Sequence, residues 1–169
     1  MTITLYAASI PVYKQMLGSL ADILKKGEAH ATAHNFDPAV LLQSRLYPDM
    51  FPLLRQVQIA CDFARSAAAR LSNKDIPKVE DKQQTFADLQ ALIADALAFL
   101  DTVQPAQIDG QEAREVVTRP GTPHERRFTC QSYLLSYALP QFFFHVTTAY
   151  AILRHNGVEI GKKDYMGAY

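Results

Sequence analysis

Residues 134–157, LLSYALPQFFFHVTTAYAILRHNG, decide the fold predicted for this protein. The stretch is strongly apolar, and the flanking residue types mark the two ends of a helix. Thr129 is favoured at a helix N-cap, and Asn156-Gly157 is typical of a C-cap. We therefore expect a last helix between these points. Pro140 inside it removes a backbone donor, so the helix should bend near Ser136, whose carbonyl loses its partner.

Two polar residues, Gln141 and His145, interrupt the apolar part of this helix. They are four positions apart and so share one helix face. The pair is compatible with the remains of a metal site, a working polar pocket, or two core side chains with good hydrogen bonds. The residue types alone leave these three readings open.

Three further segments carry the apolar period of an amphipathic helix. A short connection in which Asp37 and Pro38 can start a small helix lies between the first and the second of them. The predicted long helices run from Ile10 to Ala33, from Asp49, read as an N-cap with Pro52 in the first turn, to Leu71, and from about Thr85 to Val103.

One region of the chain has the character of β-strands. Short stretches around Val116-Val117 and Arg127-Phe128 flank a Pro-Gly turn, which predicts a small hairpin before the last helix. The segment that follows residue 71 is expected to be a long crossover loop, and the tail after residue 157 is expected to leave the bundle. The prediction is an all-α four-helix bundle of up-down-down-up type, a single domain over residues 1–169.

Composition restricts the classes of function. The chain has 169 residues, with 17 basic and 17 acidic side chains and a formal net charge of zero. Neutral charge argues against a nucleic-acid or anionic-membrane binder. The N-terminus has no basic segment before its apolar part, and no uncharged run is long enough for a membrane span. Cys61 and Cys130 resemble reduced thiols inside helices, so we expect a cytoplasmic protein.

Four motifs carry a resemblance to a known superfamily. They are LYPDMFPLLRQV at 46–57, LPQFFFH at 139–145, AYAILRHNGV at 149–158 and GKKDY at 161–165. Together they resemble the DinB/YfiT-like superfamily of metalloenzymes, and more closely a bacterial family of unknown function within it. The resemblance spans nearly the whole chain and implies a DinB-like four-helix bundle. It also suggests a homodimer.

Members of that superfamily that bind metal use three histidines, one on the second helix and two, four residues apart, on the last. The resemblance places these positions at Gln56, Gln141 and His145. Two of the three expected ligands are therefore glutamines, and neutral amides are poor zinc or nickel ligands. We expect these three residues to form a polar cluster in the bundle core, where they can partner one another.

The function predicted is that of a bundle protein with a degenerate, metal-poor polar site at Gln56, Gln141 and His145. This site either binds an unknown small molecule or is purely structural, and no cofactor is expected. The alternative is an enzyme that resembles the thiol-dependent S-transferases and isomerases of the superfamily, with His145 as the surviving ligand of a zinc or nickel ion. In that case Tyr13 or Asp49 could complete the ligand set.

Asp62 is a third residue that could complete a metal site around His145. Elsewhere, His30 and His34 also stand four apart, with Glu28 nearby, and such a pair can bind zinc on a helix surface. Because the pair lies near the end of the first helix, we interpret it as solvated and able to pick up metal adventitiously.

Overall fold

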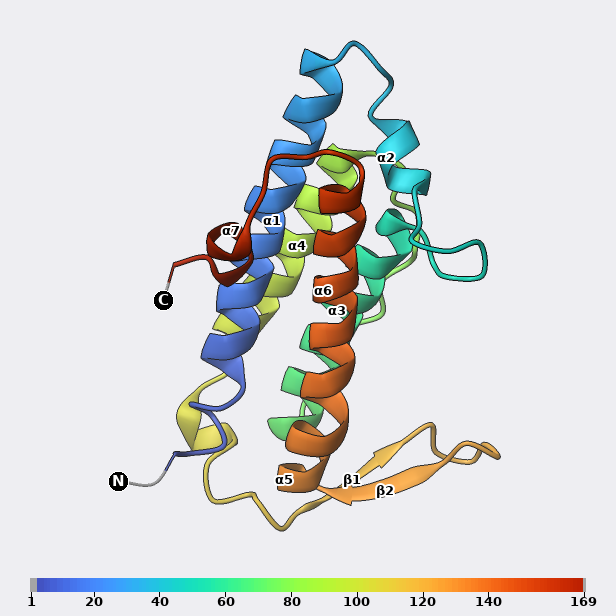
Figure 1. Ribbon diagram of the computed structural model, residues 1–169. Coiled ribbons are helices and arrows are strands. Elements are labelled where there is room, and N and C mark those ends of the chain that lie inside the picture. The colour runs from blue at the N-terminus through green and yellow to red at the C-terminus, as the bar shows by residue number, and fades with distance from the viewer. Residues whose placement is uncertain (1–2, 169) are drawn as a thin grey trace.

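Four long helices form the body of the computed structural model, which describes residues 3–168 (Figure 1). In order around the bundle, α1 contacts α4, α4 contacts α3, α3 contacts α6, and α6 closes the ring on α1. The chain runs up, down, down and up, as predicted. The bounds are Ile10–Ala33 for α1, Leu53–Leu71 for α3, Phe86–Asp101 for α4 and Leu139–His155 for α6.

Shorter elements connect these helices. The predicted hairpin is present, with Val116 opposite Phe128 in an antiparallel pair that projects from one end of the bundle (Figure 1). The small helix after Asp37 is also present. The bounds are Ala39–Gln43 for α2, Pro105–Gln107 for a 3-10 turn, Glu115–Thr118 for β1, Arg126–Thr129 for β2, Cys130–Tyr133 for α5 and Lys162–Met166 for α7.

The prediction that Asp49 caps the second long helix is wrong. Helix α3 begins at Leu53, and Pro52 occupies the N-cap position in an extended conformation, with φ −70° and ψ 166°. Asp49 lies exposed in the preceding loop. The Leu53 amide is satisfied instead by the Ser44 carbonyl at 2.9 Å, so this helix start needs no side-chain cap.

The cap expected at Thr129 is confirmed, and Thr85, at the predicted start of the third long helix, is a second one. The Thr85 hydroxyl accepts from the Asp88 amide, and the Asp88 carboxylate accepts from the Thr85 amide, which makes a capping box for α4. The Thr129 hydroxyl accepts from the Ser132 amide at the start of α5. Local sequence therefore fixed two helix starts where a threonine side chain was available.

The last helix changes its hydrogen bonding just before Pro140. Residues Leu134–Ala138 are π-helical, and the Leu139 amide bonds to the Leu134 carbonyl five residues back. The proline was expected to bend the helix near Ser136, and the structure places a π segment around that residue. A π segment rotates all later side chains relative to an unbroken α-helix, so it helps to set the face that Gln141 and His145 present.

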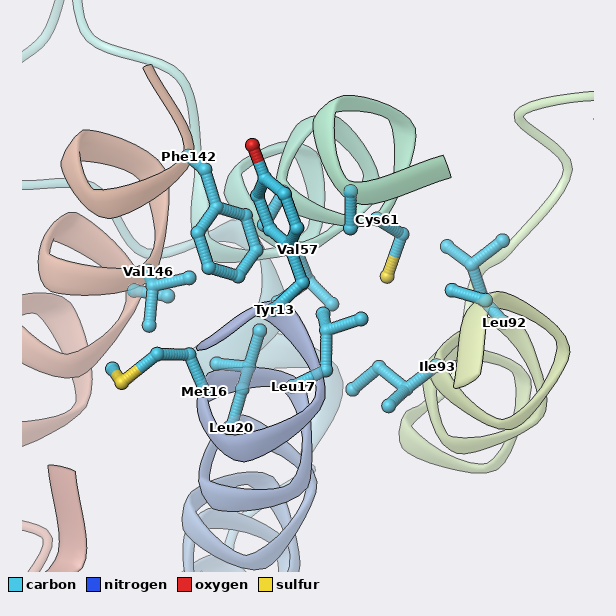
Figure 2. Packing of buried hydrophobic residues seen from close by; sticks show 14 of the residues in the cluster. Tyr13, Met16, Leu17, Leu20, Val57, Cys61, Leu92, Ile93, Phe142 and Val146 are labelled. Atoms are coloured by element: carbon cyan, nitrogen blue, oxygen red, sulfur yellow. The ribbon is translucent and has the colours of Figure 1, made fainter. Parts of the chain in front are cut away.

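The core lies between the four helices (Figure 2). Tyr13, Leu17 and Leu20 from α1 meet Val57 from α3 and Phe142 from α6, all of them buried. The Tyr13 and Phe142 rings pack edge to face with centroids 4.8 Å apart. Each such side chain contributes about 1.5–3 kcal/mol by leaving water, so this packing fixes α3 against α6 and places the polar residues between them.

The tail does not leave the bundle, contrary to the prediction. Helix α7 packs beside α1 (Figure 1). The Ser19 hydroxyl donates to the Tyr165 carbonyl at 2.6 Å, and Lys26 pairs with Asp164 at 2.5 Å. The Tyr165 hydroxyl also bonds to the Thr147 hydroxyl at 2.8 Å. The tail therefore contacts both the first and the last long helix.

Within residues 3–168, no helix combines the length and the apolar character needed to cross a membrane.

Candidate functional site

His145 and Gln56 form a buried polar pair between α6 and α3. The imidazole Nδ1 lies 2.7 Å from Oε1 of Gln56. His145 is only 7% exposed and Gln56 only 1% exposed. The two side chains predicted to meet in the bundle core are thus in direct contact, from residues 89 positions apart.

The second hydrogen bond of Gln56 determines how the histidine is protonated. The Gln56 amide nitrogen donates to the Phe51 carbonyl at 3.0 Å, which leaves its oxygen facing the imidazole. An amide oxygen can only accept, so Nδ1 of His145 carries the proton in this pair. Nε2 then keeps a free lone pair.

The surroundings of His145 favour its neutral form. Burial, and then the positive charge of Arg55, lower the pKa of His145 from 6.5 to about 4. At neutral pH the imidazole is therefore uncharged, and its Nε2 is an acceptor.

Aromatic rings border the imidazole on two sides. Phe63 stacks on it with centroids 5.9 Å apart and planes 17° apart, and Phe144 meets it edge to face at 5.2 Å. Gln141 lies one turn earlier on α6, half-buried, and its side chain has no hydrogen bond to any other residue in the range 3–168. The structure therefore joins Gln56 to His145, while Gln141 stays beside the pair without a bond to it.

The side chains around His145 that could act as metal ligands do not fit a tightly held metal ion. Gln56 uses its oxygen for the imidazole and its nitrogen for a backbone carbonyl, so it orients His145 and is not a free ligand. Within residues 3–168, no group of three or more His, Cys, Asp or Glu side chains is placed to hold a metal. One imidazole and one amide are too few for zinc or nickel.

The residues named as possible additional ligands have other surroundings. Tyr13 is buried in the core, and its hydroxyl has no hydrogen-bond partner in the described part of the chain. Asp62 accepts a hydrogen bond from Arg65 at 2.7 Å. Asp49 is exposed in the loop before α3. None of the three is hydrogen-bonded to the His145–Gln56 pair.

His30 and His34 lie at the end of α1, as predicted. Their rings are 4.1 Å apart, His34 is exposed, and its Nδ1 lies 2.9 Å from the His30 carbonyl oxygen. They border a cavity of about 460 Å³, together with Lys26 and Glu159. The pair is accessible to solvent and lies on a part of the bundle separate from the His145–Gln56 pair.

Both cysteines are buried free thiols. Burial raises the pKa of Cys61 to about 12 and also raises the pKa of Cys130 above its ordinary value. A thiol is a nucleophile only as thiolate, so neither is activated for catalysis.

Sequence reasoning missed Arg55 and Phe51 as partners of the site. Arg55 bonds to Gln58 and pairs with Asp81 of the crossover loop, so its charge is held near the imidazole. Phe51 contributes a backbone carbonyl, for which no side-chain signal exists. Both precede Gln56 closely in the chain, and this proximity was the only indication in the sequence.

A family model described as a domain of unknown function, DUF1993, matches residues 5–166. The chain belongs to the DUF1993 family. A DinB family member protein from Shewanella denitrificans, solved as a crystal structure at 1.83 Å resolution, is 41% identical, with a TM-score of 0.91. The alignment covers 98% of this chain and 93% of that chain. This DUF1993 protein thus has the predicted DinB-like fold. Comparison with curated proteins gave no match.

Proposed function

We propose that this DUF1993 protein binds a small neutral molecule at the His145–Gln56 pair, without a metal. The observation that carries the proposal is the 2.7 Å contact between Nδ1 of His145 and Oε1 of Gln56. Because the Gln56 oxygen accepts a hydrogen bond from the Nδ1–H group, the imidazole presents Nε2 as a fixed acceptor. A ligand that donates a hydroxyl or N–H proton is the chemical match.

Nε2 of His145 is an unused acceptor. It makes no hydrogen bond to any residue in the range 3–168, and the low pKa of the ring keeps it unprotonated. An unprotonated nitrogen without a partner on a buried ring is a feature that a purely structural pair does not require.

The neighbouring rings indicate the rest of the ligand. Phe63 and Phe144 both pack on the imidazole, and Phe144 is 55% exposed. An aromatic or otherwise apolar body would pack on these rings while its donor meets Nε2. A carboxylate is disfavoured because the low pKa of His145 keeps the ring uncharged.

Ligand-observed and nitrogen-detected NMR would test the proposal with p-cresol, benzyl alcohol and indole. Toluene is the matched probe without a donor. We expect the donor probes, and not toluene, to shift the Nε2 resonance of His145. His145→Asn keeps a donor near Gln56 and removes Nε2, so it should abolish the effect. Equal binding to His145→Asn, or no response to any of the three donors, would favour the purely structural reading.

Metal content separates this proposal from the alternative of a metal-dependent, thiol-using transferase or isomerase. Plasma mass spectrometry on tag-free protein should give less than one zinc or nickel per chain. Any metal present should disappear in the His30→Ala/His34→Ala variant and persist in His145→Ala. Stoichiometric metal that is lost only in His145→Ala would support the enzyme instead.

The homodimer and the cytoplasmic location stay predictions from the sequence. Apolar surface that a second copy would cover includes Phe51, 55% exposed, and Tyr47, 65% exposed. Light scattering after gel filtration should give about twice the 18.9 kDa of one chain. A mass of one chain at micromolar concentration would contradict the dimer.

A further inference from the structure

A second cavity, of about 420 Å³, lies between α3, the crossover loop and the hairpin. It is separate from the His145–Gln56 pair, although Phe63 contributes to both. Its wall includes basic side chains from three different segments of the chain. They are Arg65 and Arg70 of α3, Lys78 of the crossover loop and Arg119 at the end of β1.

Arg65 is the central observation. The residue is only 3% exposed, and its Nη2 donates to the Asp62 carboxylate at 2.7 Å. Its Nη1 is buried and has no partner in residues 3–168. A buried N–H without an acceptor costs about 1–3 kcal/mol, and more on a charged group. A bound acceptor in the cavity would remove this cost.

The charged side chains of the wall are mostly positive. Four of the lining side chains are cationic and one, that of Asp62, is acidic. Among the described residues, the side chains of Lys78 and Arg119 form no ion pair. In a chain of zero net charge, this concentration of unpaired cations is a local feature of one site.

Contacts hold the side chain of one cation and the backbone of another. Arg70 lies over the Tyr133 ring, 5.8 Å from its centroid, and its Nη1 is 3.4 Å from the Tyr133 hydroxyl. Arg119 has φ +50°, a left-handed conformation that is uncommon for a residue with a side chain. The Thr122 hydroxyl donates to the Arg119 carbonyl at 2.9 Å within that turn. Strained backbone of this kind often accompanies binding sites.

The remaining wall is apolar and aromatic. Phe63 and Tyr137 meet edge to face at 6.1 Å, and Ile76 and Val79 of the crossover loop stay 43% and 38% exposed. An inorganic ion would leave this surface uncovered. A molecule with an apolar part and an anionic group matches both halves of the wall.

We propose that this cavity binds a small organic oxyanion, a carboxylate or a phosphate monoester on an apolar body, through the guanidinium groups of Arg65 and Arg119. The planar guanidinium donates paired N–H groups, which suit both oxyanions. The unpartnered Nη1 of Arg65 donates to one ligand oxygen, and the apolar body packs on Phe63 and Tyr137. This site does not depend on the function proposed for His145.

Isothermal titration with benzoate, phenyl phosphate, inorganic phosphate and the neutral isostere benzamide tests the proposal. We expect benzoate or phenyl phosphate to bind more tightly than benzamide and inorganic phosphate, and whichever anion binds more tightly identifies the class. Benzamide equal to benzoate, or inorganic phosphate equal to phenyl phosphate, would overturn it. So would the failure of both organic anions to bind at about 10 mM.

Variants locate the binding. Arg65→Met can disturb folding because Arg65 is buried, so Lys78→Gln/Arg119→Gln provides the exposed test. We expect it to weaken anion binding about tenfold. The matched control Arg126→Gln/Lys162→Gln removes two exposed cations outside the cavity and should change affinity less than about twofold. His145→Asn should leave anion binding unchanged. Equal weakening by the control pair would show non-specific attraction and overturn the site.

Discussion

His145 donates its Nδ1 proton to the side-chain oxygen of Gln56 across 2.7 Å, although 89 positions separate the two residues. From the sequence, the resemblance to the DinB/YfiT-like superfamily predicts metal-ligand positions at both residues. Here the glutamine binds the histidine directly, and its own amide group is anchored to the Phe51 carbonyl. Gln56 thus holds the imidazole of His145 in one orientation, and the ring is neutral.

The pH dependence of stability should reflect His145. Its pKa is about 4 in the folded protein, below the ordinary 6.5, so the unfolded chain binds the proton more readily between these values. Stability is therefore full above pH 6.5 and falls as the pH drops toward 4, by up to about 3 kcal/mol. Urea unfolding at several pH values would measure this. In His145→Asn the free energy of unfolding should no longer fall between pH 6.5 and 4 on account of this residue. An unchanged dependence on pH would show that His145 does not cause it.

Removing the Gln56 side-chain amide should destabilise the bundle. Gln56→Leu leaves the Nδ1 proton of His145 without an acceptor and the Phe51 carbonyl without its donor. We expect a loss of about 1–3 kcal/mol in the free energy of unfolding. Gln131→Leu, at an exposed glutamine, is the control and should change stability by less than about 0.5 kcal/mol. Similar losses in both variants would show that the pair is not special.

Gln56→Glu should raise the pKa of His145. A carboxylate at this position accepts the Nδ1 proton and supplies a negative charge that favours the imidazolium. NMR titration of the imidazole should then give a pKa well above 4. If the pKa stays near 4, the Gln56 oxygen does not face the ring as described.

Gly167→Ala should loosen the tail. Gly167 has φ +64°, and a Cβ there would lie 3.0 Å from the Ser19 Cβ. Both strain and crowding oppose the methyl group, so we expect amide exchange in Lys162–Met166 to accelerate about tenfold or more. Gly110 has a similar φ of +82° with nothing within 4 Å of the added Cβ. Gly110→Ala should leave exchange in the tail unchanged, and exchange that is equally slow in both variants would contradict the role of Gly167 in holding the tail.

Arg114 should stabilise the end of α3. Its Nη2 donates to the carbonyls of Arg70 and Leu71 at 2.6 and 2.9 Å, in the last turn of the helix, where carbonyls lose their i+4 partners. Arg114→Met should cost about 1.5–3 kcal/mol. The exposed Arg126, changed to Met, is the control. Chemical denaturation compares the two variants, and equal stability would mean that water replaces Arg114 at no cost.

Much of the fold followed from local sequence. The apolar period located the four long helices, and Thr85 and Thr129 marked two helix starts. Asp49 misled because the extended Pro52 and a backbone bond from Leu53 to Ser44 start α3 without it. Ser44 and Leu53 are brought together by the fold of the loop between them, which local sequence rules do not predict.

The sequence by itself determined the helices, the hairpin and the presence of Gln141 and His145 on one helix face, because helical period and capping depend on neighbours in the chain. Tertiary structure alone decided that Gln56 accepts a hydrogen bond from His145, that the imidazole is neutral, and that Arg65 lines a cationic cavity. The reason is that hydrogen-bond partners and burial come from segments distant in sequence, and they set the chemistry of a side chain.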